Sequence, residues 1–312
     1  MKSKNKISLI APFYNEEKGV FHFIERVNSV MEKVSDRFDL EVICINDGSR
    51  DGTLKELIQV KKDNSHMKIV DFSRNFGKEA AITAGLDFAT GDIVVPIDSD
   101  LQHPPEVILD MVKSWEEGYE VVLARRVDRD TDRAIQRMTA RAFYEVSRYI
   151  SHIDIPADVG DFRLMDRKVV EAIKQLNENC RFMKGIFAWV GFRTTTIDYK
   201  VENRAFGKTS FNTWKLWNFA LEGITSFSTF PLRVWTYLGM TISSLSFLFA
   251  IYLIIKTLIF GVETPGYTST MVTILFCSGV QLIGVGVLGE YIGRIFSEVK
   301  RRPSYIVREM IE

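Results

Sequence analysis

The sequence has few of the residues that build disulfide frameworks or soft-metal sites. It contains three cysteines and four histidines among 312 residues. Cys44, Cys180 and Cys277 lie far apart, and no histidines stand at ligand spacing beside them, so neither a disulfide framework nor a zinc site is predicted. We expect buried thiols in a reducing compartment.

The chain also lacks an excess charge, a secretory leader and the common nucleotide-binding motifs. Its 40 basic residues balance 40 acidic ones, so no nucleic-acid partner is expected. The basic N-terminus is followed by alternating residues that soon reach Pro12 rather than by an apolar core, so the first domain is expected to stay where it is made. No G-x-G-x-x-G follows the first predicted strand and no P-loop motif occurs, which excludes those two ways of holding a nucleotide.

Long apolar runs occur only in the last third of the chain. Residues 234–255 form a run of 22 without a charged side chain, and residues 264–289 form another of 26. Because a membrane span needs about 20 such residues, we expect transmembrane helices in segments 233–260 and 269–296, joined by an external loop at 261–268. Basic residues flank the pair on one side, which predicts that both chain ends, including the tail 297–312, are cytoplasmic.

Two further features point to the membrane. The segment 212–232 mixes Trp214, Trp217 and Phe219 with charged residues and leads into the first span, which is typical of an interfacial helix. A core helix of the soluble domain remains the alternative. Small residues in the second span favour close helix packing and therefore a homo-oligomer: Gly279, Gly284, Gly286 and Gly289.

Residues 1–211 show the pattern of an α/β domain. Strands are predicted at 7–12, 41–46, 68–72, 92–97, 120–124, 162–165 and 194–199. Helices are predicted between the early strands, at 17–34, 52–62, 78–89 and 105–117. This alternation predicts a mostly parallel sheet with helices on both faces.

Acidic residues follow three of the predicted strands, where an open parallel sheet binds its ligands. Glu16 follows the first strand, Asp47 the second, and Asp98 and Asp100 the fourth. In an extended backbone residues i and i+2 point the same way, so the last two can face one hard cation that also holds a diphosphate. A lone Asp-x-Asp is more often a surface turn, but its place at a buried strand end favours the metal site.

Several motifs resemble those of a known family. They are 11–17 (APFYNEE), 46–53 (NDGSRDGT), 73–78 (SRNFGK) and 98–106 (DSDLQHPPE). Together they resemble the family 2 glycosyltransferases with a GT-A fold. Residues 160–167 and 288–295 are similar to the polyprenyl-phosphate glycosyltransferases, especially the bactoprenol glucosyltransferases of O-antigen modification.

The resemblance implies a role for each motif. The nucleotide sugar would be bound by Pro12, Tyr14, Glu16, Asp47, Lys78 and Asp98. Asp98 and Asp100 would hold the diphosphate through Mg²⁺ or Mn²⁺, and Gln102 would lie beside the donor sugar. Asp161 stands where the family has an acidic residue near the acceptor. Because a phosphate monoester has a second pKa of about 6, we expect Asp161 to orient a substrate as much as to abstract a proton.

Cations are needed for the acceptor phosphate. The candidates are Arg125, Arg126, Arg204 and Lys208. For Lys208, attraction to anionic lipid headgroups is an equal alternative. The Gln-x-x-Arg-Trp signature of processive synthases is missing, which favours transfer of a single sugar.

The implied activity is an inverting transfer of glucose from UDP-glucose to undecaprenyl phosphate at the bacterial inner membrane. The product would be a β-linked polyprenyl-phosphate sugar for O-antigen or cell-envelope modification, made by a multi-pass protein with its catalytic domain in the cytoplasm. The alternatives are another donor sugar, such as mannose, N-acetylglucosamine or a modified arabinose, and a catalytically inactive membrane scaffold.

Overall fold

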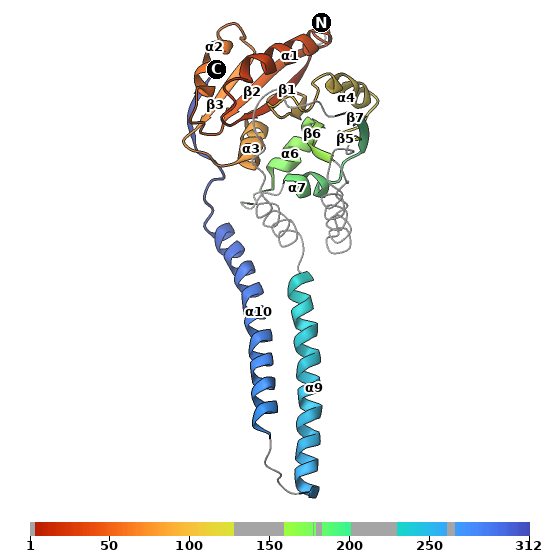
Figure 1. Cartoon of the computed structure of the whole chain (residues 1–312). Helices are drawn as coiled ribbons and strands as arrows, with labels where there is room; N and C mark the ends of the chain where they lie inside the picture. Colours follow the sequence, from red (N-terminus) through yellow and green to blue (C-terminus); the bar gives the residue numbers. More distant parts are fainter. Residues whose placement is uncertain (1–3, 128–158, 177, 179–182, 201–229, 261–265) are drawn as a thin grey trace. The chain divides into compact units, whose positions relative to one another are not determined.

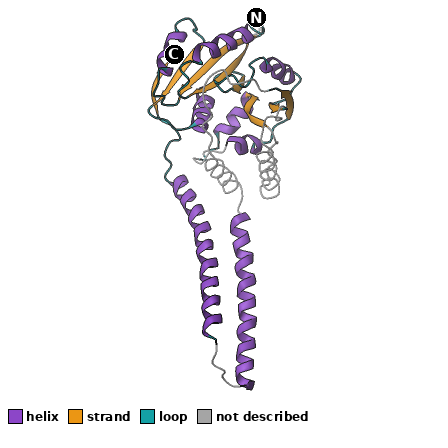
Figure 2. Ribbon diagram, viewed as in Figure 1, coloured by secondary structure: helices purple, strands orange, loops and turns teal. Residues whose placement is uncertain are grey.

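The computed structural model describes residues 4–127, 159–176, 178, 183–200, 230–260 and 266–312, which fall into two units. The first unit lies within Met1–Ala220 and Arg302–Glu312, and the second within Leu221–Arg301. In the described part of the first unit, eight strands form one sheet in the order β7-β5-β6-β4-β1-β2-β3-β8 (Figures 1 and 2). The strands are β1 (Asn5–Phe13), β2 (Phe38–Asn46), β3 (Met67–Phe72), β4 (Ile93–Pro96), β5 (Val121–Arg126), β6 (Val159–Asp166), β7 (Thr194–Tyr199) and β8 (Val307–Ile311).

The sheet is mostly parallel, as predicted. Strands β4, β1, β2 and β3 run parallel to one another, and β7 runs parallel to β5. Strand β6 is antiparallel to both β4 and β5, and β8 is antiparallel to β3. The sequence analysis placed all the strands except β8 within a few residues. Strand β8 lies in the tail 297–312, for which no strand was predicted.

Helices cover both faces of the sheet. They are α1 (Val20–Glu32), α2 (Thr53–Lys61), α3 (Lys78–Phe88), α4 (Val107–Glu116), α6 (Arg167–Lys174) and α7 (Met183–Trp189). Side chains alternate along β1, so Leu9 joins Phe23 of α1 in the larger core, whereas Ile10 faces α3 on the other side. A β-carbon at Gly85 of α3 would overlap Ile10, so this helix packs on the sheet only because residue 85 is glycine.

The pairing of β4 with β6 determines which candidate site residues lie close together. Ile93 pairs with Asp166 and Val94 with Met165 in an antiparallel register. The beginning of β6 therefore lies at the same edge as the end of β4. Continuing this register places residue 98 opposite residue 161, although 62 positions separate them in the chain.

The second unit contains two long helices, α9 (Phe230–Phe260) and α10 (Tyr267–Val299). By length and composition, one helix in the described part of the chain qualifies as a candidate membrane span, Phe276–Val299 within α10. The predicted spans 233–260 and 269–296 lie within α9 and α10, and that both cross a membrane stays a prediction. Of the predicted interfacial helix, residues 212–229 lie outside the described residues.

Candidate active site

A lysine joins two carboxylates at the carboxyl edge of the parallel strands. Asp98 follows β4, Asp161 belongs to the beginning of β6, and Lys78 is the first residue of α3. The Nζ atom of Lys78 lies 2.7 Å from Oδ1 of Asp98 and 2.8 Å from Oδ2 of Asp161. We call this arrangement the Lys78 bridge. It unites three residues that the sequence analysis assigned to the site separately.

The Lys78 bridge is held in its charged form. Burial disfavours the ionised form of Asp98, but Lys78 and then His103 hold the pKa of this carboxyl well below its usual range. Burial likewise opposes the charge of Lys78, but Asp98 and Asp161 raise the pKa of the ammonium well above its usual range. Asp98 and Asp161 thus share the ammonium of Lys78.

His103 and Tyr199 support the Lys78 bridge from one side. Nε2 of His103 lies 3.4 Å from Oδ2 of Asp98, and Nδ1 lies 2.6 Å from the hydroxyl of Tyr199. Burial raises the pKa of Tyr199 to about 12, so the phenol keeps its proton. Phe162 packs against both rings, with centroids 5.3 Å from His103 and 5.9 Å from Tyr199. His103 therefore packs beside the aspartate motif.

Tyr199 was missed by the sequence analysis. It is the last residue of β7, so its position at a strand end was the available signal. The sequence analysis considered carboxylates at strand ends as metal ligands and therefore did not consider a tyrosine.

Asp100 and Gln102 lie in the tight loop after β4. The amide of Gln102 donates to Oδ1 of Asp100 at 3.1 Å. The backbone turns at Ser99 and Asp100, so the alternation of an extended strand does not reach the second aspartate. Leu101 is buried with φ of 57°, a left-handed conformation that costs a non-glycine residue about 1 kcal/mol. Within the described residues, no group of three His, Cys, Asp or Glu side chains is placed to hold a metal.

Asp47 is engaged within the protein. Its carboxylate, 3% exposed, accepts hydrogen bonds from the amides of Phe76 at 2.6 Å and Gly77 at 2.9 Å. The side-chain amide of Asn75 donates to it as well, at 2.9 Å. Burial raises the pKa of Asp47 against the opposing effect of these amides. Asp47 thus anchors the loop 73–77 that leads into Lys78, and its predicted contact with the nucleoside stays a prediction.

Gly48 explains how closely this loop approaches. Its φ is 60°, and a β-carbon there would lie 2.3 Å from the carbonyl carbon of Arg74. Only glycine permits both the conformation and the contact. The Asp-Gly pair after β2 is therefore required by the packing of loop 73–77.

The end of β1 and the loop that follows it are tied to their neighbours through the backbone. The carbonyl of Pro12 accepts from the hydroxyl of Ser99 at 2.9 Å, and the amide of Glu16 donates to Oγ1 of Thr53 at 2.9 Å. The side chain of Tyr14 is 44% exposed, which leaves its ring available to stack on a base. These contacts join the end of β1 to the loop after β4, and the loop after β1 to the beginning of α2.

The predicted acceptor cations divide into two groups. Arg125 is the penultimate residue of β5 and forms a two-pronged ion pair with Asp198, with Nε 2.7 Å from Oδ1 and Nη2 3.0 Å from Oδ2. Arg126 is half-buried at the same strand end. Arg204 and Lys208 lie outside the described residues.

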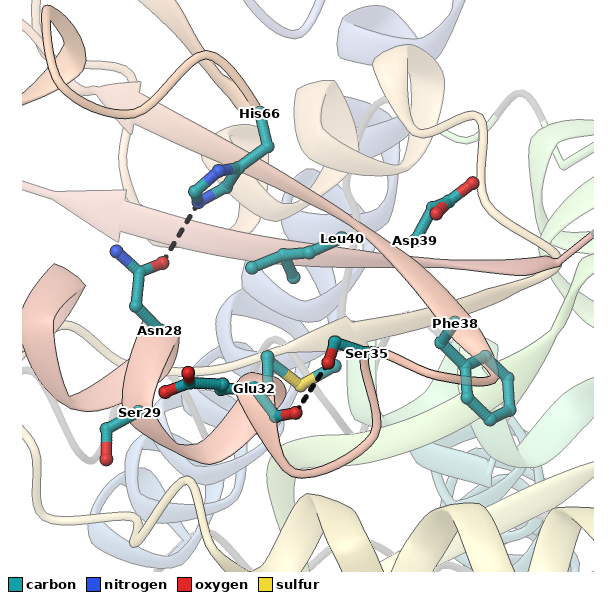
Figure 3. Close-up of a pocket in the computed structure, with 9 residues that line it drawn as sticks. Asn28, Ser29, Glu32, Ser35, Phe38, Asp39, Leu40 and His66 are labelled. Carbon is teal, nitrogen blue, oxygen red and sulfur yellow. Dashed lines mark hydrogen bonds between the residues drawn. The ribbon is translucent and has the colours of Figure 1, made fainter.

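A cavity of about 550 Å³ lies elsewhere in the domain (Figure 3). It is lined by the end of α1, the following turn, the beginning of β2 and His66. The ring of His66 lies 3.0 Å from Oδ1 of Asn28, which points toward it in the picture. None of the predicted site residues that the structure describes lines this cavity, so it is separate from the Lys78 bridge.

Comparison with known proteins decides the family. A model of glycosyl transferase family 2 matches residues 8–174, which include the Lys78 bridge. The chain belongs to the family 2 glycosyltransferases. A second model, the GtrB C-terminal hairpin, matches residues 230–295, which cover α9 and most of α10. This glycosyltransferase therefore combines a family 2 domain with a GtrB-type hairpin.

Its relatives extend over nearly the whole chain. An SfII prophage-derived bactoprenol glucosyl transferase of Shigella flexneri is 51% identical over 304 residues, covering 97% of this chain and 98% of that protein. A prophage bactoprenol glucosyl transferase homolog of Escherichia coli K12 is 49% identical, covering 98% and 99%. An uncharacterized glycosyltransferase of Synechocystis is 53% identical, covering 98% and 95%. Family membership thus rests on full-length similarity.

Solved structures show weaker similarity. Glucosyl-3-phosphoglycerate synthase of Mycobacterium tuberculosis, solved with Mn²⁺, UDP-glucose and phosphoglyceric acid, has a TM-score of 0.47 at 20% identity, covering 71% of this chain and 78% of that one. A mannosyltransferase of Pyrobaculum calidifontis, solved with GDP-Man and Mn²⁺, has a TM-score of 0.46 at 21% identity, covering 69% and 61%.

Proposed function

We propose that this glycosyltransferase transfers one glucose unit from UDP-glucose to undecaprenyl phosphate, with inversion, in O-antigen or cell-envelope modification. The observation that carries the proposal is the identity of about 50% to bactoprenol glucosyl transferases over nearly the full length, hairpin included. The GT-A fold is part of the proposal, supported by the mostly parallel sheet with its acidic carboxyl edge.

The chemistry requires one displacement. The bond between C1 of glucose and the β-phosphate oxygen breaks, and UDP leaves with the bonding electron pair. A phosphate oxygen of the acceptor forms the new bond to C1 from the opposite face, so an α-linked donor gives a β-linked product. The acceptor phosphate is largely dianionic at neutral pH, so no base has to remove a proton. Asp161, fixed by Lys78, would orient the sugar or the acceptor.

The donor set fits a hard divalent cation brought with the diphosphate. Asp98 and Asp100 supply oxygen ligands on one short loop, and Mg²⁺ or Mn²⁺ commonly takes its remaining ligands from phosphates and water. One oxygen of Asp98 is held by Lys78 and the other by His103, so the protein alone offers an incomplete site. A cation bound there would neutralise charge on the departing diphosphate. Lys78 would add a second positive charge beside it.

The topology of the chain supports a membrane hairpin. Strands β1 and β8 belong to one sheet, although α9 and α10 lie between them in the sequence. An open sheet cannot extend through lipid, so the chain between these strands crosses a membrane an even number of times. If α10 spans the bilayer, α9 has to span it too. With the basic residues after α10, this supports a multi-pass protein of the bacterial inner membrane with both termini cytoplasmic. The interfacial segment 212–232 and a homo-oligomeric state remain part of the proposal.

The test is transfer of radiolabelled glucose from UDP-glucose to undecaprenyl phosphate in detergent, with Mg²⁺, with Mn²⁺ and with EDTA. Wild type should give labelled lipid with a cation and none with EDTA, and Asp100→Ala should give none. Asp110→Ala, an exposed aspartate of α4 paired with Lys113, is the matched control and should behave as wild type.

Other outcomes would correct the proposal in definite ways. Labelled lipid with GDP-mannose or UDP-N-acetylglucosamine alone would replace the donor and keep the reaction class. Undiminished transfer in EDTA would show that the reaction does not require a divalent cation. No product with any nucleotide sugar would overturn the enzymatic proposal.

A further inference from the structure

The strand that follows the hairpin enters the catalytic sheet beside β3. In β8, Met310 pairs with Val70 and Glu309 with Asp71. The last residue, Glu312, lies with its carboxylate 3.8 Å from Nζ of Lys68. The C-terminus of the chain is thus built into the domain that contains the Lys78 bridge.

A polar path runs from β8 to the loop that contains Asp47. Nη1 of Arg308 lies 3.3 Å from Oδ2 of Asp71, and its Nη2 donates to the carbonyl of Ser73 at 2.9 Å. Asp71 is 2% exposed, and its Oδ1 accepts from the side-chain amide of Asn46 at 2.7 Å. Asn46 in turn accepts from the amide of Ser49 at 3.3 Å. Three of these contacts join the C-terminal strand to the turn after β2, and the contact with Ser73 joins it to loop 73–77.

An aromatic path runs from the same segment to the loop before α3. The ring of Tyr305 stacks on Phe72, with centroids 5.2 Å apart and planes inclined by 13°. Phe72 meets the edge of Phe76 at 5.7 Å. The hydroxyl of Tyr305 donates to Oδ2 of Asp87 in α3 at 2.8 Å. Tyr305 thus contacts β3 and α3, the elements on either side of loop 73–77.

The two paths reach the two segments around Asp47: the polar path reaches the turn after β2, and the aromatic path reaches Phe76 in loop 73–77. The amides of Phe76 and Gly77 donate to Asp47, and the next residue is Lys78. The amide of Ser73 donates to the carbonyl of Ile306 at 3.0 Å, so the loop is pinned at its beginning by the C-terminal segment. A displacement of this loop would move the partners of Asp47 and the origin of α3 together.

We propose that Arg308 and Tyr305 are positioning residues for the donor nucleotide, acting through loop 73–77 and the turn after β2. The inference rests on the proposed function, because it takes Asp47 and Lys78 as part of the donor site. Loss of Arg308 would leave the buried carboxylate of Asp71 without its cation and the carbonyl of Ser73 without this donor. Both changes loosen the donor side, whereas Arg125 and Asp198 of the predicted acceptor side make no contact with this segment among the interactions described.

The experiment measures donor and acceptor separately on the full-length protein in detergent. UDP binding is followed by calorimetry, and initial rates are measured against UDP-glucose and against undecaprenyl phosphate. For Arg308→Ala we expect the UDP dissociation constant and the KM for UDP-glucose to rise about 10-fold, which corresponds to about 1.4 kcal/mol. The KM for undecaprenyl phosphate should stay within twofold of wild type.

Matched variants make the result specific. Arg308→Lys keeps the charge and should restore most of the donor affinity. Glu309→Ala changes the neighbouring exposed residue of the same strand and should equal wild type. Tyr305→Ala tests the aromatic path independently and should give the same donor-selective change, so the inference stays testable if one variant does not fold.

Two results would overturn the positioning role. One is an Arg308→Ala protein, and a Tyr305→Ala protein, that bind UDP as wild type does. The other is a parallel loss of donor and acceptor parameters in proportion to the folded fraction, which marks a purely structural effect. A wild-type protein that neither binds UDP nor transfers glucose would instead overturn the proposed donor, so the two failures are distinguishable.

Discussion

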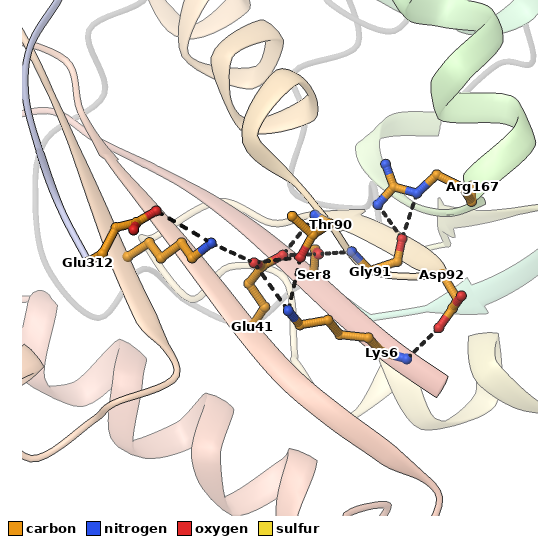
Figure 4. A network of polar contacts seen from close by, with 9 residues as sticks. Lys6, Ser8, Glu41, Thr90, Gly91, Asp92, Arg167 and Glu312 are labelled. Carbon is orange, nitrogen blue, oxygen red and sulfur yellow. Dashed lines mark hydrogen bonds and ion pairs between the residues drawn. The ribbon is translucent and has the colours of Figure 1, made fainter. Parts of the chain in front are cut away.

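Two carboxylates in this domain each form an ion pair with lysine, toward opposite ends of the parallel strands of the sheet. Glu41, in the first half of β2, is 2% exposed (Figure 4). It accepts from the hydroxyl of Ser8 and from both the amide and the hydroxyl of Thr90, at 2.9 and 2.8 Å. Lys68 lies 3.2 Å and Lys6 3.6 Å from its Oε1. All these partners lie in strands or directly beside them.

Asp98, toward the other end of these strands, has a different set of partners. It is held by Nζ of Lys78 and the ring of His103, both side chains that reach it from other segments. Its side chain is 30% exposed, against 2% for Glu41. The neutral donors that saturate Glu41 have no counterpart among the contacts described for Asp98. A carboxylate held chiefly by the side chains of Lys78 and His103 can exchange them for a ligand, whereas one saturated by backbone and hydroxyl donors stabilises the fold.

The largest expected effect comes from breaking the Lys78 bridge. Asp98→Asn keeps the shape of the side chain but removes the charge that pairs with Lys78 and that the proposed cation would need. Glucose transfer should fall about 100-fold or more, as for other electrostatic groups of active sites. The midpoint of thermal unfolding should change little. The test is the initial rate of glucose transfer by the folded variant, with Asp110→Asn as control. A variant that keeps half the wild-type rate would contradict the prediction.

The reverse result is expected for Glu41→Gln. Removing this charge leaves Lys6 and Lys68 without their shared carboxylate. One carboxylate oxygen also becomes an NH2 group, which cannot accept the hydrogen bonds that Ser8 and Thr90 donate. The free energy of unfolding should fall by about 3 kcal/mol, in the range for a broken buried pair. Transfer per folded molecule should be unchanged. Chemical denaturation in detergent measures the free energy of unfolding, with Glu25→Gln at an exposed position as control. A loss of activity without a loss of stability would contradict a structural role for Glu41.

Lowering the pH should reduce the difference in stability between the wild type and Glu41→Gln. Burial raises the pKa of Glu41, but hydrogen bonds from Ser8 and Thr90 and the nearby Lys68 lower it from 4.5 to about 2. A lowered pKa stabilises the fold above pH 4.5, and this contribution of about 3 kcal/mol is lost as the pH falls toward 2. The difference in unfolding free energy between wild type and Glu41→Gln should therefore shrink over that interval. A difference that stays constant from pH 5 to pH 2 would contradict the assigned role.

The smallest effect on stability is expected at Arg125. Its pair with Asp198 is about half exposed on both sides, so breaking it should change the stability of the fold little. If Arg125 binds the acceptor, Arg125→Ala should raise the KM for undecaprenyl phosphate about fivefold and leave that for UDP-glucose unchanged. Asp198→Ala breaks the same pair and keeps the arginine. Equal acceptor KM values in the two variants would argue against a role for Arg125 in binding.

The sequence predicted the framework well because the strands are short apolar runs bounded by polar residues. It also singled out Asp98, Asp161 and Lys78, one by one, as candidate site residues. That they meet follows from the antiparallel entry of β6 beside β4, which no local pattern reveals. Local periodicity reports which face a side chain occupies, but not which distant strand lies next to it.

Strand β8 escaped prediction for a related reason. Its residues 307–311 mix Arg308 and Glu309 with apolar side chains, as an edge strand often does, so no clear alternation appears. Glu41 offered a signal that was not used, since a carboxylate directly before the apolar run 42–45 has to find partners when the strand is buried. Arg204, Lys208 and residues 212–229 lie outside the described residues, so their predicted roles are unchanged.

The position of β8 has a consequence for how the protein is made. Translation proceeds from the N-terminus, so β3 is synthesised more than 230 residues before the strand that pairs with it. Until the hairpin has left the ribosome, the edge of β3 has no β8 to cover it, and unpaired edges promote aggregation. The catalytic sheet is thus completed only after α9 and α10 have been synthesised, which links maturation of the domain to production of these two helices.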